Sequence, residues 1–195
     1  MLSQTQNTPY WWLDAPRPPE IPTDQPAKVD VAVVGAGFTG LNTALVLARA
    51  GLSVIVFEAG QLGEGASTRN GGMIGPSFHK LGIDGLRAKY GQDRTNDIVR
   101  ESIGFVDYLD GFLKTEGIEA ELERNGRFRG ALRPAHYDDM QRQLESLQSA
   151  CGVEGFMVPQ ADQAAETGSR RFFGGVVYNT DGGLHPAKYH NGLAA

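Results

Sequence analysis

The stretch Val29–Glu58, VDVAVVGAGFTGLNTALVLARAGLSVIVFE, decides the fold. Its β-branched run, residues 29–34, predicts a strand that breaks at Gly35. The apolar residues that follow recur at helical spacing, at Leu41, Ala44, Leu45 and Ala48. Gly51 can end that helix, and residues 53–57 predict a second strand. Strand, helix and strand in this order predict one parallel βαβ unit.

The turn after the first strand has the G-x-G-x-x-G spacing of a dinucleotide site. Gly35 permits the tight turn, Gly37 lets the backbone approach a pyrophosphate, and Gly40 lets the helix pack closely on the strand. The helix amino terminus offers N–H groups and a positive dipole end to an anion. Glu58, 18 residues after Gly40, can accept hydrogen bonds from both ribose hydroxyls and would repel a 2′-phosphate, which disfavours NADP. The alternative is that the glycines only form a turn and Glu58 is a solvated acid.

Residues 60–75 distinguish this chain from a simple NAD domain, in which a further helix and strand soon follow. The segment is rich in glycine and small polar residues and has neither a helical nor an alternating apolar period. We therefore expect an extended loop. Such a loop suits a cofactor longer than NAD.

Within that loop, Ser67-Thr68-Arg69-Asn70-Gly71-Gly72 resembles the loop of the D-amino-acid oxidase-like (glycine oxidase and sarcosine oxidase) flavoprotein family. A second segment, residues 181–189, resembles the family's return from the substrate domain to the cofactor domain. The resemblance implies an α/β, Rossmann-like FAD-binding domain with part of an α+β substrate (cap) domain. Within the family, residues 65–72 and the aromatic amino-terminal arm look similar to bacterial γ-glutamylputrescine oxidoreductase-type enzymes.

The resemblance also implies that this loop runs beside the flavin end of FAD, with Arg69 near the isoalloxazine ring. A cation there would favour negative charge on the reduced flavin. Alternatively, Arg69 forms a surface salt bridge or braces the loop. No catalytic residue is assigned. The expected cofactor-binding residues are Gly35, Ala36, Gly37, Phe38, Thr39, Gly40, Glu58, Ala59, Ser67, Thr68, Arg69, Asn70, Gly71 and Gly72.

The rest of the chain predicts further elements. Residues 93–116 have one apolar stripe and predict a long helix. Residues 119–133 predict a hairpin with Asn125-Gly126 in a type I′ turn. Residues 134–151 predict a helix that begins at a proline, ends at Gly152 and has Met140, Leu144 and Leu147 on one face. Residues 172–178 predict a strand, residues 181–183 a glycine turn, and Pro186 begins a last helix.

We expect four regions: an amino-terminal arm (1–27), an FAD-binding domain (28–80), a partial substrate domain (81–175) and a return segment (176–195). Trp11 and Trp12 should pin the arm onto the body without forming an element of their own. A single βαβ unit leaves strand edges without neighbours, and the last helix is cut off at the chain end. We therefore expect a truncated chain, or one that a second polypeptide completes.

Composition excludes other classes. The net charge is −5 and the basic residues form no stripe, so nucleic-acid binding is not expected. No apolar run reaches the roughly 18 residues of a transmembrane helix, and no export signal is visible. Cys151 is the only cysteine, which excludes an intrachain disulfide and a thiolate metal cluster and fits the cytoplasm. The spacing of His185 and His190 argues against a metal, and His79 is expected to be structural rather than to meet substrate or flavin.

These features predict an FAD-dependent oxidoreductase that oxidises the C–N bond of an amine or amino acid by hydride transfer to flavin. The electrons would pass to oxygen or to an electron carrier. Two alternatives remain: a truncated, non-catalytic nucleotide-binding module, and an NAD-dependent dehydrogenase with a different catalytic half.

Overall fold

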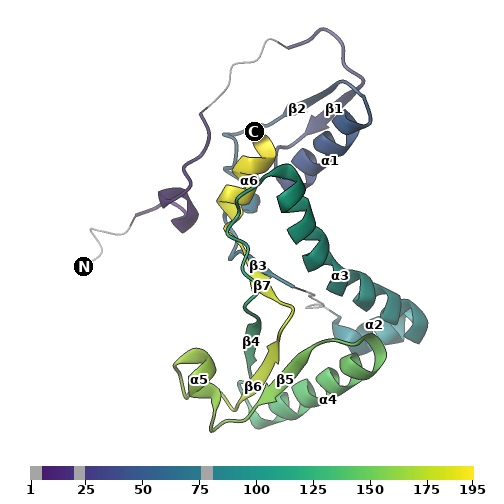
Figure 1. The fold of residues 1–195 in the computed structure, drawn as a ribbon, viewed down its shortest axis with the longest axis vertical. Coiled ribbons are helices and arrows are strands. Elements are labelled where there is room, and N and C mark those ends of the chain that lie inside the picture. The colour runs from purple at the N-terminus through teal and green to yellow at the C-terminus, as the bar shows by residue number, and fades with distance from the viewer. Residues whose placement is uncertain (1–5, 20–24, 76–80) are drawn as a thin grey trace. The chain divides into compact units, whose positions relative to one another are not determined.

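The computed structural model describes residues 6–19, 25–75 and 81–195. It consists of two compact units, which are described separately. The first unit comprises Met1–Gly72, Leu113–Glu121 and Leu184–Ala195, and the second comprises Met73–Phe112 and Leu122–Gly183. Both units are therefore built from segments far apart in the sequence (Figure 1).

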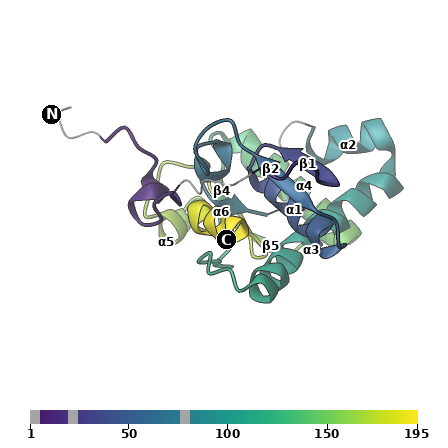
Figure 2. The same ribbon diagram turned by 90° about the horizontal axis from the view of Figure 1, so that it is seen from above.

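The first unit contains the βαβ arrangement that the sequence predicts. Strand β1 (Val31–Val34) pairs in parallel with β2 (Val54–Phe57), with Val31 opposite Val54 and Val34 opposite Phe57. Helix α1 (Phe38–Arg49) joins them and packs on the sheet and on α6 (Pro186–Ala194), as Figure 2 shows from above. Gly51 has φ +85°, as expected for a residue that follows a helix. The predicted strand–helix–strand order and the last helix are both confirmed.

Short elements correct two expectations. The arm forms a 3-10 helix, η1 (Tyr10–Leu13), where no element was expected. The segment 60–75 contains a second 3-10 helix, η2 (Ala66–Thr68), and ends in strand β3 (Met73–Ile74). A single turn of 3-10 helix or a two-residue strand is too short to show a hydrophobic period, so the sequence pattern could not reveal these three elements.

The second unit is an antiparallel sheet with helices. Its strands are β4 (Arg127–Gly130), β5 (Gly155–Val158) and β6 (Gly175–Tyr178), in the order β4-β6-β5. The long helix α3 (Gln92–Glu116) and α4 (Pro134–Cys151) confirm the two predicted helices, and Gly152 ends α4 in a left-handed conformation. Helices α2 (Gly82–Tyr90) and α5 (Gln163–Thr167) and strand β5 were not predicted.

The predicted hairpin at residues 119–133 is wrong. Strand β4 pairs with β6, which is distant in sequence, whereas Glu123 bridges to Gly183. Asn125 does not have the positive φ that a type I′ turn requires, because Glu121 is the one non-glycine residue with positive φ in the described segments. The expected glycine turn is also wrong, since Gly182–Gly183 form strand β7 opposite β3. Long-range pairing therefore overrides the local turn signal.

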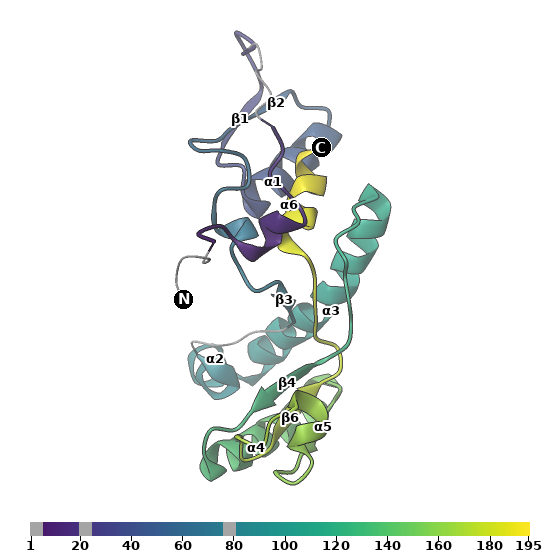
Figure 3. The ribbon, with the colours of Figure 1, turned by 90° about the vertical axis from the view of Figure 1, so that its left-hand side faces the viewer.

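Two apolar clusters form the core of the second unit. One joins Ile83, Val99, Leu147 and Val153, and the other joins Ala131, Met140, Leu144 and Val176. Figure 3 shows α4 beside β6, and the face of α4 that carries Met140, Leu144 and Leu147 is buried as predicted. Among the helices of the described segments, none is long and apolar enough to cross a membrane.

Candidate cofactor site

The glycine loop between β1 and α1 has the conformation that its sequence requires. Gly35 has φ +96°, a region that side-chain-bearing residues rarely adopt, and its N–H donates to the Phe57 carbonyl at 2.7 Å. Gly37 is the N-cap of α1 in an extended conformation. A Cβ at Gly40 would lie 1.9 Å from the Gly35 carbonyl oxygen. The loop therefore closes tightly on the first turn of the helix, and this closure needs glycine at position 40.

An open groove of about 560 Å³ lies at the amino terminus of α1. Its walls come from the end of β1, the glycine loop, the first turns of α1 and the segment 66–70. The lining residues are Val33, Val34, Gly35, Gly37, Phe38, Thr39, Gly40, Thr43, Ala66, Ser67 and Asn70. The first N–H groups of a helix have no partner within the helix. The groove therefore suits an anionic group such as a pyrophosphate, and its size lies within the usual range for ligand sites.

Glu58 follows β2 and turns its carboxylate toward the glycine loop. Oε2 accepts a hydrogen bond from the Ala36 N–H at 2.7 Å, and Oε1 accepts one from the Gly60 N–H at 3.2 Å. The Ala36 bond, and then the Gly60 bond, hold the pKa of Glu58 below its ordinary value. The residue is exposed, so its remaining lone pairs face solvent. An ionised carboxylate at this edge of the sheet is available to hydroxyl donors.

His190 is one residue beside the site whose role sequence reasoning missed. Its side chain on α6 is fully buried, and Nε2 lies 2.7 Å from the Ala36 carbonyl oxygen. Because a carbonyl only accepts, Nε2 must carry the proton. Nδ1 is buried and has no hydrogen-bond partner among the described residues. Ala36 is thus held on both sides, by Glu58 at its N–H and by His190 at its carbonyl, and no sequence spacing links partners 154 residues apart.

The segment after Glu58 is tied to the glycine loop through Ser67. Its Oγ accepts the N–H of Phe38, the first residue of α1, at 3.0 Å. Thr68 is buried and donates to the Gly63 carbonyl at 2.5 Å, whereas Asn70 accepts the Gly72 N–H through Oδ1 at 2.9 Å. The predicted loop is therefore folded on itself by its own polar side chains.

The other residues predicted for the site lie around the groove. Arg69 is exposed, and its guanidinium carbon lies 5.0 Å from the centre of the Trp12 ring. Gly72 has φ +70°, and its carbonyl accepts the Leu184 N–H at 2.9 Å. Among the described residues, the predicted ones that do not line the groove are Ala36, Glu58, Ala59, Thr68, Arg69, Gly71 and Gly72.

The other histidines considered from the sequence are His185 and His79. His185 is the N-cap of α6, because its Nδ1 accepts the Lys188 N–H at 3.1 Å. His79 lies outside the described residues.

Comparison with known proteins agrees with this geometry. The family model described as DAO, FAD dependent oxidoreductase, matches residues 30–195. A probable oxidoreductase OrdL of Haemophilus influenzae is 32% identical over 174 residues, which are 89% of this chain and 40% of that protein. The γ-glutamylputrescine oxidoreductase of Escherichia coli is 30% identical over 157 residues, 80% of this chain and 36% of that protein.

Among solved structures, glycine oxidase from Bacillus cereus superposes with a TM-score of 0.65 at 22% identity, covering 86% of this chain and 43% of that one. The chain therefore spans less than half the length of these relatives. The family match confirms the predicted resemblance to the D-amino-acid oxidase-like flavoproteins, and the likeness of fold confirms the expected α/β class. Because the matched family is FAD-dependent, the alternative of an NAD-dependent dehydrogenase is excluded. The chain belongs to the DAO family of FAD-dependent oxidoreductases.

Proposed function

We propose that the glycine loop, Glu58 and the segment 66–72 bind FAD, and that the whole protein uses it to oxidise the C–N bond of an amine or amino acid. The observation that carries the binding proposal is the groove at the amino terminus of α1. Two of the relatives support the substrate class, since one is named a γ-glutamylputrescine oxidoreductase and another a glycine oxidase.

In this proposal different residues bind different parts of the cofactor. The N–H groups at the start of α1 hold the pyrophosphate, because the helix end supplies both donors and a positive partial charge. Glu58 accepts hydrogen bonds from the ribose hydroxyls, with the lone pairs that are not used by its hydrogen bonds from two backbone N–H groups. Ser67 to Gly72 lie toward the flavin, where the Arg69 cation favours negative charge on the reduced ring. Bound FAD supplies the acceptor for a hydride, and oxygen or a carrier protein then takes the electrons.

The remaining expectations belong to the same proposal. The lone cysteine, Cys151, suits a cytoplasmic location. The region 28–80 and the return segment 176–195 would form the cofactor domain, and residues 81–175 would form part of the substrate domain.

Titration of the purified 195-residue chain with FAD, followed by flavin fluorescence, tests binding. We expect saturable binding of FAD and none of NAD at the same concentration. Glu58→Ala should weaken FAD binding about tenfold, because it removes both ribose bonds. Gly104→Ala, on α3, is the control, since a Cβ there meets nothing within 4 Å and the residue lies outside the proposed site. NAD bound in place of FAD would contradict the cofactor assignment.

Amine-dependent loss of the oxidised flavin absorbance tests the reaction. We expect bleaching under anaerobic conditions when an amine or amino acid is added, and peroxide on readmission of air if oxygen is the acceptor. FAD binding without bleaching by any amine or amino acid would instead favour a nucleotide-binding module without catalytic function.

A further inference from the structure

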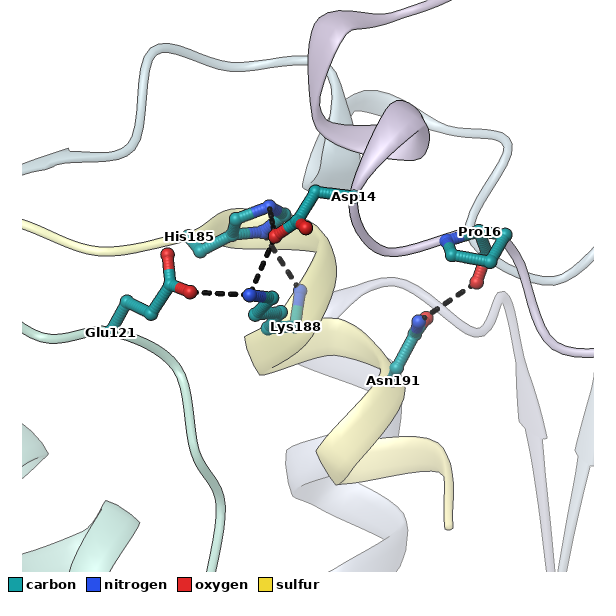
Figure 4. Close-up of polar contacts among 6 residues, drawn as sticks. All are labelled: Asp14, Pro16, Glu121, His185, Lys188 and Asn191. Carbon is teal, nitrogen blue, oxygen red and sulfur yellow. Dashed lines mark hydrogen bonds and ion pairs between the residues drawn. The ribbon is translucent and has the colours of Figure 1, made fainter.

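The amino-terminal arm is anchored to the first unit at points away from the groove. Asp14 forms an ion pair with Lys188 of α6 at 2.6 Å, and Lys188 also pairs with Glu121. Asn191 donates to the Pro16 carbonyl at 3.1 Å. Figure 4 shows these contacts, in which α6 lies between the arm and the segment that carries Glu121. Neither tryptophan takes part in these contacts, so we expect the arm to stay attached to α6 when Trp12 is changed.

From this anchor, the two indole N–H groups reach the segment 66–72. Trp12 Nε1 donates to Thr68 Oγ1 at 3.0 Å, and Trp11 Nε1 donates to the Asn70 carbonyl at 2.7 Å. Thr68 is 1% exposed, and its hydroxyl donates a hydrogen bond to the Gly63 carbonyl. Trp12 thus begins a chain of two hydrogen bonds that crosses the loop from Thr68 to Gly63.

The ring of Trp12 also contacts Arg69. The guanidinium carbon of Arg69 lies 5.0 Å from the ring centre, and that of Arg17, from the arm itself, lies 4.4 Å away. A guanidinium within about 6 Å of an indole centre is attracted by the ring quadrupole. One side chain therefore contacts two consecutive loop residues, Thr68 through its N–H and Arg69 through its ring.

We propose that Trp12 is a positioning residue of the FAD site, which fixes Thr68 and Arg69 and thereby the wall of the groove. The link to the groove runs through Ser67, which precedes Thr68, lines the groove and accepts the N–H of Phe38, the first residue of α1. This inference rests on the proposed FAD function. It assigns the arm a role in cofactor binding. The sequence of the arm does not predict this role, because the arm lies outside the βαβ unit.

Hydrogen exchange in the cofactor-free chain tests the contact itself. Trp12→Phe keeps a ring but removes the donor to Thr68, so the amides of residues 66–70 should exchange about fivefold faster. Tyr10→Phe is the matched control, since Tyr10 is 76% exposed in the same 3-10 helix. Equal exchange in both variants would overturn the proposal.

FAD affinity and the flavin reduction potential test the role in the site. We expect Trp12→Phe to weaken FAD binding about fivefold and Trp12→Leu to weaken it further, because leucine also removes the ring from Arg69. Trp12→Leu should make the midpoint potential more negative, and the same change in an Arg69→Gln background should not. If Trp12 only held the loop and had no influence on the cofactor, Trp12→Leu would leave the midpoint potential unchanged in the wild-type and in the Arg69→Gln background.

The two possible failures are distinguishable. FAD bound equally well, and with equal potential, by the wild type and by both Trp12 variants overturns the role of Trp12 alone. No FAD bound by the wild-type chain overturns the proposed function of this chain, and the role of Trp12 with it.

Discussion

The interactions within the first unit differ in kind from those within the second. In the second unit, two clusters of buried apolar side chains join α3, α4 and the antiparallel sheet. In the first unit, the residues that shape the groove are fixed by polar contacts: Glu58 and His190 on Ala36, Ser67 on Phe38, and Trp12 on Thr68. Strand β1 even leaves Val34 88% exposed. The candidate cofactor site is therefore shaped by directional bonds, and the second unit by packing.

The two units also contain carboxyl groups with opposite pKa shifts. Backbone N–H donors, first that of Ala36, lower the pKa of Glu58. Burial raises the pKa of Asp181, although Arg127, at 2.6 Å, partly offsets the effect of burial. The first unit thus contains a hydrogen-bonded surface carboxylate, and the second a buried one. The pKa of each carboxyl group can be tested by a substitution or a titration.

The largest expected effect comes from the packed unit. Leu144→Ala should lower the free energy of unfolding by about 2–5 kcal/mol, because Leu144 is 4% exposed and packs with Met140 and Val176. Chemical denaturation followed by far-ultraviolet circular dichroism measures it. Leu132→Ala, at a site 67% exposed in the same unit, should cost less than about 0.5 kcal/mol. Equal effects at the two sites would contradict the account of the second unit as one held together by packing.

Gly40→Ala should have the next largest effect, and it should fall on the first unit. A Cβ 1.9 Å from the Gly35 carbonyl forces the glycine loop apart, at about 3 kcal/mol. FAD affinity should fall with it, as a fluorescence titration would show. Gly104→Ala introduces the same methyl group on an exposed face of α3 and serves as control. Unchanged FAD binding by Gly40→Ala would separate the glycine loop from the cofactor.

His190→Leu should cost about 2 kcal/mol, because the buried Ala36 carbonyl loses its donor. His190→Gln can offer an N–H in its place and should restore part of the loss. Thermal unfolding and FAD titration of the three proteins measure both effects. If leucine and glutamine behave alike, side-chain volume rather than the hydrogen bond determines the contribution of His190.

Carboxyl titration by NMR gives the smallest and most local effect. Glu58 should titrate below its ordinary pKa, so its contribution to stability is present above that ordinary value and is lost as the pH falls through the lowered one. Asp181 should titrate above its ordinary pKa, so acidification through that range favours the folded state at this residue. Glu58→Gln and Asp181→Asn should each remove one resonance and its pH dependence. Shifts of the same sign would contradict the comparison.

The sequence predicts the first unit better than the second for a physical reason. The βαβ elements are adjacent in the chain, so periodicity and glycine spacing carry nearly all the information. Strand β4 pairs with β6, almost fifty residues away, and the local Asn125-Gly126 signal therefore misled. Buried faces of long helices, such as Met140, Leu144 and Leu147, were predictable because their spacing is regular.

The same reasoning explains the partial prediction of the site. The sequence shows where the two parallel strands end. It therefore predicts the positions of the residues that follow them, which are Gly35, Gly37, Gly40 and Glu58. His190 and Trp12 could not be predicted as site residues, because each acts through a contact with a distant segment. Their residue types alone carry no such information.

The most direct test of the central claim is a crystal structure of this chain with FAD bound. We expect the pyrophosphate within hydrogen-bonding distance of the N–H groups at the start of α1, and the ribose hydroxyls on the Glu58 carboxylate. FAD bound away from the amino terminus of α1, or a ribose that does not touch Glu58, would contradict it.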